Sequence, residues 1–402
     1  KPCQCLDGNV GLRMEYDAAG RETLRVSFGK DGAPAMLTAG YAGIRKEYDA
    51  NGNETRCTWL GTDLQPKLQP EGCAAARKEY DATGRETLRV WLGEDGAPVM
   101  LPAGYSGTRK EYDASGNETL CMWLGTDLQP LLQPEGFAGM RKEYDAAGRE
   151  VKRVYLGEDG KPCQHPDGNA GLRMEYDAAG HETLRVYLGA DGVPVMLSGG
   201  YTGTRKEYDA NGNETLCMWL GMDLQPKLQP EGFAGMRKEY DAAGREVKRW
   251  YLGEDGKPCQ HPDGNTGLRM EYDAAGRETL RVFLGEDDAP VMMPGGYTGI
   301  RKEYDANGNE TLCMWLGTGL QPKLQPEGFA GIRKEYDAAG RETLRVFLGE
   351  DDAPVMLSDG YAGIRKEYDA QGREVKRWYL GGDGKPCQHP DGNTGLRMEY
   401  DA

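Results

Sequence analysis

Residues 176–207 read YDAAGHETLRVYLGADGVPVMLSGGYTGTRKE, and this 32-residue stretch decides the fold because the chain repeats it from end to end. Every repeat has the same length, without insertion or deletion. A spacing this strict predicts that each unit occupies the same structural slot, because an added residue would disturb stacking against both neighbours. The dipeptide Tyr-Asp marks the period, beginning at residues 16, 48, 80, 112, 144, 176, 208, 240, 272, 304, 336, 368 and 400.

The units differ in the half that follows their second turn. The GAP version reads GAPVMLPAGYSGTRK at 96–110, the LQP version reads LQPKLQPEGFAGMRK at 224–238, and the CQHP version reads GKPCQHPDGNTGLRM at 256–270. The chain starts midway through a unit and stops just after a Tyr-Asp. We expect one continuous array of about 12.5 repeats over residues 1–402, cut as a window from a longer protein.

Each unit carries the signals of β-hairpins. Residues 118–124 alternate, with Leu120, Met122 and Leu124 on one face and Cys121 and Trp123 on the other. Residues 107–112 also alternate, and the Asp-x-x-Gly of 113–116 between the two segments suits a type I turn closed by a left-handed glycine. A second turn at 93–96, a short third strand and a glycine-rich return complete the unit. The sequence predicts an all-β fold of tandem 32-residue β-hairpins stacked into an elongated rod or solenoid-like array.

Composition limits the classes of function. Apolar residues make up 38% of the chain and there are 59 glycines, which suits a thin layered core. The net charge of −16 is spread evenly over the units and argues against nucleic acid or an anionic membrane as the partner. We find no apolar run long enough for a membrane span. Any catalytic constellation would be copied a dozen times, whereas an active site needs a unique pocket, so we expect neither an enzyme nor a cofactor.

The string YDANGNET at 208–215, and YDAAGRET at 272–279, resembles the YD repeats of Rhs-type and teneurin-type surface proteins. The Tyr/Trp-Leu-Gly-x-Asp-Gly stretch is similar to the aromatic-glycine hairpin repeats of bacterial cell-wall-binding proteins. The families' shorter repeats do not match the 32-residue period, and the terminal core motif of Rhs proteins is absent from this sequence. The resemblance implies β-hairpin architecture and a secreted or cell-surface setting.

Ten cysteines occupy recurring slots. The interval from Cys121 to Cys163 equals that from Cys217 to Cys259, one full period plus ten, and this common spacing predicts two disulfides in an oxidising compartment. Cys57 is predicted to pair with Cys73 of its own unit, because the following unit offers no partner. Free or interchain thiols are the alternative, and for Cys313 they are the expectation.

Two segments have the composition of metal sites, and neither is predicted to be one. Cys163 and His165 share a strand face, but each unit supplies only two such ligands and a linear array would not gather four. The acidic segment 209–214, DANGNE, resembles an oxygen-ligand loop for calcium, yet turn propensity alone explains it.

Two further sets of residues could face a partner. A row of aromatic residues suits stacking on sugar rings, although it could equally cover the second face of the sheet; its tryptophans in the LQP units are Trp59, Trp123, Trp219 and Trp315. Four Asn-Glu-Thr sequons would accept glycan in a secreting eukaryote and are otherwise turn residues: Asn53, Asn117, Asn213 and Asn309.

The sequence therefore predicts an extracellular or cell-surface structural repeat protein that associates with neighbouring copies, for example in fibres. The alternative is a multivalent glycan-binding or cell-wall-binding module that uses the aromatic row, with polysaccharide as the partner.

Overall fold

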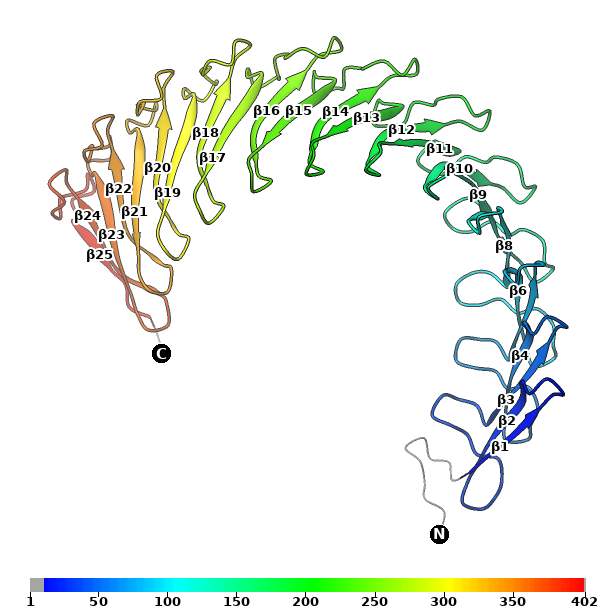
Figure 1. Cartoon of the computed structure of the whole chain (residues 1–402). Helices are drawn as coiled ribbons and strands as arrows, with labels where there is room; N and C mark the ends of the chain where they lie inside the picture. The colour runs from blue at the N-terminus through cyan, green and yellow to red at the C-terminus, as the bar shows by residue number, and fades with distance from the viewer. Residues whose placement is uncertain (1–10, 401–402) are drawn as a thin grey trace. The chain divides into compact units, whose positions relative to one another are not determined.

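The computed structural model describes residues 11–400 and divides the chain into two compact units, Lys1–Thr202 and Gly203–Ala402, which are described separately. The described residues form 25 β-strands and no helix. Within each unit, consecutive strands pair antiparallel, so that every 32-residue repeat contributes one hairpin (Figure 1). The all-β fold of repeated hairpins is confirmed.

The strands keep nearly constant bounds. Those of the first unit are β1 (Gly11–Tyr16), β2 (Glu22–Phe28), β3 (Gly43–Tyr48), β4 (Glu54–Leu60), β5 (Ala75–Tyr80), β6 (Glu86–Leu92), β7 (Gly107–Tyr112), β8 (Glu118–Leu124), β9 (Gly139–Tyr144), β10 (Glu150–Leu156), β11 (Gly171–Tyr176) and β12 (Glu182–Leu188). Those of the second unit are β13 (Gly203–Tyr208), β14 (Glu214–Leu220), β15 (Gly235–Tyr240), β16 (Glu246–Leu252), β17 (Gly267–Tyr272), β18 (Glu278–Leu284), β19 (Gly299–Tyr304), β20 (Glu310–Leu316), β21 (Gly331–Tyr336), β22 (Glu342–Leu348), β23 (Gly363–Tyr368), β24 (Glu374–Leu380) and β25 (Gly395–Arg397).

The hairpin turn of each repeat has the geometry that its sequence predicts. Between β7 and β8, the Gly116 N–H donates to the Asp113 carbonyl at 3.1 Å, and Gly116 has a φ of 92°. The Asp113 carboxylate accepts the N–H groups of Ser115 and Asn117, both at 2.9 Å. Because this conformation has positive φ, glycine is the residue that tolerates it without strain. The prediction is confirmed in all twelve turns, whose glycines are Gly20, Gly52, Gly84, Gly116, Gly148, Gly180, Gly212, Gly244, Gly276, Gly308, Gly340 and Gly372.

The strand pairing between successive hairpins is shorter than the pairing within one hairpin. Strand β8 pairs with β9 at only three positions, from Leu120 opposite Arg141 to Met122 opposite Gly139. The predicted third strand is reduced to one bridge, in which Pro130 lies opposite Leu124. Proline has no N–H, so it cannot continue a ladder of hydrogen bonds. The return then closes in a turn, with the Gly136 N–H donating to the Gln133 carbonyl at 2.9 Å.

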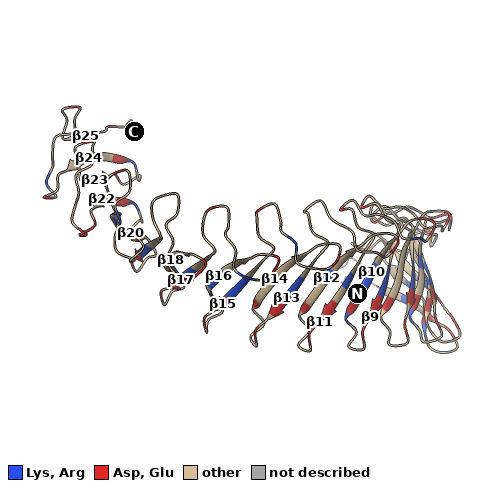
Figure 2. Cartoon of the chain, turned by 90° about the horizontal axis from the view of Figure 1, so that it is seen from above, with Lys and Arg blue, Asp and Glu red and all other residues tan. Residues whose placement is uncertain are grey.

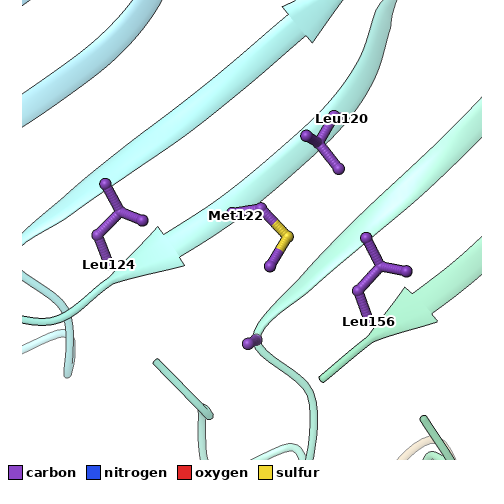
Figure 3. Close-up of a cluster of buried hydrophobic side chains, with 5 residues drawn as sticks. Leu120, Met122, Leu124 and Leu156 are labelled. Atoms are coloured by element: carbon purple, nitrogen blue, oxygen red, sulfur yellow. The ribbon is translucent and has the colours of Figure 1, made fainter. Parts of the chain in front are cut away.

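The apolar core is shared between neighbouring repeats. Leu120, Met122 and Leu124 from β8 pack with Ala138 and with Leu156 from β10, and all five are buried (Figure 3). Burying each leucine contributes about 1.5–3 kcal/mol. Since Leu156 belongs to the next repeat, a hairpin completes its core only in the array.

Acidic and basic residues both occur along the strands of each unit (Figure 2). Many of them form local pairs, such as Arg89 with Glu86 at 2.7 Å. In the LQP repeats, Glu54 instead lies between Lys46 and Lys78, at 3.1 and 2.9 Å. Burial raises the pKa of Glu54, but the hydrogen bonds from the two lysines outweigh it and hold that pKa below its usual value.

Candidate functional site

The Tyr-Asp dipeptide is clamped by the repeat that precedes it. The Tyr112 hydroxyl donates to the Glu86 carbonyl at 3.0 Å, and the Arg85 guanidinium lies 5.1 Å from the centre of the Tyr112 ring. Arg85 also donates to the Asp113 carbonyl at 2.7 Å, while its Nε donates to the Asp81 carboxylate at 2.7 Å. One arginine thus joins two successive turns and covers the tyrosine between them. We call this arrangement, built from Asp81, Arg85, Glu86, Tyr112 and Asp113, the Tyr-Asp clamp.

The clamp recurs along both units. The tyrosine hydroxyl donates to a glutamate carbonyl of the preceding hairpin at 2.8–3.0 Å in each of the following: Tyr48, Tyr80, Tyr112, Tyr144, Tyr176, Tyr240, Tyr272, Tyr304, Tyr336, Tyr368 and Tyr400. Arginine after the turn glycine completes the clamp at Arg21, Arg85, Arg149, Arg245, Arg277 and Arg341. From the sequence alone, Tyr-Asp is only a marker of the period. The constant spacing from arginine to tyrosine is the signal that could have revealed the contact.

The four sequon asparagines take the arginine's place in LQP repeats. The Asn117 Nδ2, the atom that would carry a glycan, donates to the Asp113 carboxylate at 2.9 Å. This hydrogen bond holds the pKa of Asp113 below its usual range. The same bond is made at 2.9 Å by Asn53, Asn213 and Asn309. Their glycosylation stays a prediction. In this structure the nitrogen that would carry the glycan donates a hydrogen bond within the turn.

The structure does not bring the predicted disulfide partners together, and the cysteines at 57, 73, 121, 163, 217, 259, 313 and 387 are free thiols. Two strands lie between the two cysteines. Cys121 lies opposite Met140 of β9, and Met140 lies opposite Tyr155 of β10. Cys163 lies beyond β10, where its N–H donates to the Tyr155 carbonyl. Three strand spacings amount to about 14 Å, far beyond the Cα separation of a disulfide. The equal spacing along the chain therefore reflects equal positions in the repeat and not proximity.

The other two predicted pairs are separated in similar ways. Cys217 is kept from Cys259 by Met236 and Tyr251. Cys57 lies opposite Ala76, three residues beyond Cys73, and both cysteines are free. Cys3 and Cys5 fall outside the described residues.

Cys121 occupies the strand position that arginine holds in the neighbouring repeats, at Arg89 and Arg153. Burial raises the pKa of the Cys121 thiol. The nearby Lys110, directly opposite, is paired with Glu118 at 2.8 Å. Because a thiolate is disfavoured here, this cysteine is suited to packing and not to nucleophilic chemistry.

The segments with the composition of metal sites serve as turns. The Asp209 carboxylate accepts the N–H groups of Asn211 and Asn213, both at 2.9 Å. His165 Nδ1 accepts the Asp167 N–H at 3.2 Å, and its ring packs on Tyr155 at 5.0 Å. Within residues 11–400, no three His, Cys, Asp or Glu side chains gather in a group that could hold a metal ion. That part of the chain also has no helix that could cross a membrane.

The aromatic row lies on the face opposite the leucine core and runs from ring to ring across repeats. Trp123 contacts Phe137, with ring centres 5.5 Å apart, and Phe137 contacts Tyr155 of the next hairpin at 4.8 Å. The series is repeated at Trp219 and Phe233, and again at Trp315 and Phe329, each with 5.5 Å between ring centres. At Trp59 the phenylalanine is replaced by Cys73. The four tryptophans are half-buried.

No family model matches this sequence, and no curated protein matches it. Among solved structures, a crystal structure of TcdB2-TccC3-TEV is 12% identical and covers 95% of this chain and 19% of its own, with a TM-score of 0.27. A Photorhabdus luminescens Tc holotoxin pore is 12% identical, with 96% and 18% covered and a TM-score of 0.24. Alternansucrase in complex with isomaltononaose is 15% identical, with 66% and 18% covered and a TM-score of 0.17. The chain thus spans about a fifth of each of these three chains. At these identities and TM-scores nothing about function follows from the likeness.

Proposed function

We propose that this chain is a structural repeat protein of the cell surface or extracellular space, whose arrays associate with one another into fibres. The observation that supports the structural role is the Tyr-Asp clamp. Its tyrosine makes the same hydrogen bond to the preceding hairpin in repeat after repeat, for example at Tyr48, Tyr112 and Tyr272. Such contacts stabilise a long array through its nearest-neighbour interfaces, and they do not single out one repeat as an active site.

The association into fibres is tested on the purified chain over a hundredfold range of concentration. We expect sedimentation velocity to show assemblies that grow with concentration, and electron microscopy to show filaments with an axial repeat. A single species of constant mass across the whole range would contradict fibre formation. It would leave the structural role of one array intact.

The cell-surface location is tested separately, by treating intact source cells with protease and probing with an antibody against the array. Loss of the array signal while a cytoplasmic marker survives would support the location. Protection of the array on intact cells, with digestion only after lysis, would refute it.

A second candidate function is multivalent binding of polysaccharide, and the half-exposed tryptophans of the aromatic row favour it. Sugar rings stack well on large aromatic faces that also reach solvent. We expect saturable retention of the chain on polysaccharide beads, and weaker retention when Trp123→Ala and Trp219→Ala are combined. Trp378→Ala is the matched control, because Tyr379 takes the row position in that strand and Trp378 lies on the other face. Equal loss in the control would point to general unfolding.

A further inference from the structure

A hollow of about 500 Å³ lies beside Trp315, between two successive returns of the second unit. Tyr297 from one return and Phe329 from the next line it together with the indole of Trp315. The Trp315 and Phe329 rings meet at 70°, with centres 5.5 Å apart, so they form a corner with one aromatic face on each side. Small-molecule sites in proteins typically have volumes of roughly 300 to 1000 Å³, and this hollow falls within that range.

Two hydrogen-bond acceptors line this hollow. Gln325 is 8% exposed, and its Nε2 donates to the Lys323 carbonyl at 2.9 Å. Within the described residues, no group donates to the Gln325 Oε1, although this side chain lines the hollow. An amide oxygen in a mostly buried side chain is stabilised by any donor that reaches it. The Glu327 carboxylate lies exposed on the same rim.

The same residue types recur in the first unit. Tyr105, Trp123, Gln133 and Phe137 stand six periods before Tyr297, Trp315, Gln325 and Phe329. Gln133 is 7% exposed and donates through Nε2 to the Leu131 carbonyl at 3.0 Å, and its Oε1 again has no donor within residues 11–400. The arrangement is therefore built by the repeat and does not depend on one local irregularity.

The residues that line the hollow can be compared with the needs of two kinds of ligand, a quaternary ammonium and a neutral sugar. A quaternary ammonium could also lie against aromatic faces beside a carboxylate, but it has no N–H group to donate to the Gln325 Oε1. A neutral sugar offers apolar C–H faces to the rings and hydroxyl donors to the free carbonyl oxygen. Hydroxyl hydrogen bonds would also supply the donor that the Gln325 Oε1 lacks.

We propose that the hollow lined by Tyr297, Trp315, Gln325 and Phe329 binds hexose units of a neutral polysaccharide. Trp315 stacks against a sugar ring and the Gln325 Oε1 accepts a hydroxyl hydrogen bond. The site around Trp123 and Gln133 acts in the same way. This assignment rests on the polysaccharide-binding candidate and names its residues and its ligand class.

The test is isothermal titration of the full chain with maltohexaose and with cellohexaose, with choline chloride as the alternative ligand. We expect one of the two hexasaccharides to bind saturably. The triple variant Gln133→Leu/Gln229→Leu/Gln325→Leu removes this carbonyl oxygen from all three repeats that combine the glutamine with Trp and Phe, and should weaken binding about 5- to 10-fold, the equivalent of one hydrogen bond per site. The matched control is Gln129→Leu/Gln225→Leu/Gln321→Leu, which alters exposed glutamines in the same returns and should leave the affinity unchanged.

Thermal unfolding of each variant shows whether its fold survives. If the glutamine variants unfold, the triple variant Trp123→Ala/Trp219→Ala/Trp315→Ala provides a second test, with a loss of about 10-fold or more expected against Trp378→Ala. Unchanged affinity in folded glutamine and tryptophan variants would refute this site while leaving polysaccharide binding possible elsewhere. Binding of choline but of neither sugar would refute the ligand class. Binding of none of the three would remove the polysaccharide candidate, and the fibre experiment would then decide the structural proposal independently.

Discussion

The two residues of Tyr-Asp have separate tasks, since the tyrosine reaches back to the preceding repeat and the aspartate closes its own turn. Replacing Tyr112 with phenylalanine would keep the ring under Arg85 and remove only the hydrogen bond to the Glu86 carbonyl. We therefore expect Tyr112→Phe to lower the free energy of unfolding by about 0.5–1.5 kcal/mol, measured by urea denaturation.

The chain supplies its own control for this substitution. Among residues 11–400 the hydroxyl of Tyr16 makes a hydrogen bond only to the Met14 sulfur, at 3.3 Å, and Tyr16 is 57% exposed. Tyr16→Phe should therefore leave the unfolding curve unchanged. Equal destabilisation by both substitutions would mean that the tyrosine acts within its own strand and not as a clamp.

The turn aspartates make the array sensitive to acid. Hydrogen bonds from the Asn117 side chain and backbone hold the pKa of Asp113 below its usual value, and Asp209 and Asp305 are held down in the same way by their asparagines. A carboxylate whose pKa is lower in the folded state stabilises that state fully above its unfolded pKa of about 3.9, and this contribution is lost as pH falls through the folded value. We expect the urea midpoint to be constant from about pH 7 to 5 and to fall below about pH 4. A variant with Asp113→Asn, Asp209→Asn and Asp305→Asn should show a shallower decline, and an identical decline would assign the acid sensitivity to other groups.

At the scale of the hairpin, every leading strand that the structure describes begins with glycine except β5, which begins with Ala75. A Cβ on Gly107 would lie 2.3 Å from the Arg89 carbonyl oxygen of the preceding repeat. Relieving such an overlap moves backbone against backbone, so Gly107→Ala should cost about 1–3 kcal/mol in urea denaturation. Gly11 holds the equivalent position, and its Cβ would meet nothing within 4 Å. Gly11→Ala is thus the matched control, and equal costs would show that the glycine is needed for conformation and not for clearance.

These two kinds of glycine show what the sequence can predict and what it cannot. The turn glycines, such as Gly116, were predictable because Asp-x-x-Gly and the positive φ it requires are local features. The clearance at Gly107 depends on a carbonyl oxygen of the preceding hairpin, so no local pattern reveals it. The same limit applies to Cys121 and Cys163, because their spacing fixed their places in the repeat but not the two strands that lie between them.

The candidate site was predictable to a similar extent. Alternation placed Trp123 on the face opposite Leu120 and Leu124, and the structure confirms that arrangement. The hollow beside Trp315 was not predictable, because Gln325 and Phe329 enter it from a return with no regular secondary structure. In this return proline interrupts the ladder, and the path of the chain depends on packing against the neighbouring repeat.

For the molecule as a whole, the strict 32-residue period suggests that each repeat must keep its strand register relative to its neighbours. Deletions of different length test this requirement. Removing 121–152 takes out one full period and joins Leu120 to Arg153, which creates the strand ETLRVYL that the chain already contains at β12. Every later repeat then pairs with its preceding repeat in the normal register. We expect this chain to keep one cooperative unfolding transition, followed by circular dichroism.

Removing 121–151 takes out one residue fewer and differs only by retaining Lys152. The joined strand then reads ETLKRVYL, so Leu120 falls on one face while Val154 and Leu156 fall on the other. Exposing one or two of these side chains would cost about 1.5–3 kcal/mol each, and the cores on both sides of the junction would lose a partner. We expect hydrogen exchange to show reduced protection in the strands flanking this junction and normal protection after the full-period deletion. Equal protection in the two chains would mean that a single bulge absorbs the extra residue, and that the absence of insertions along the sequence is not a requirement of the fold.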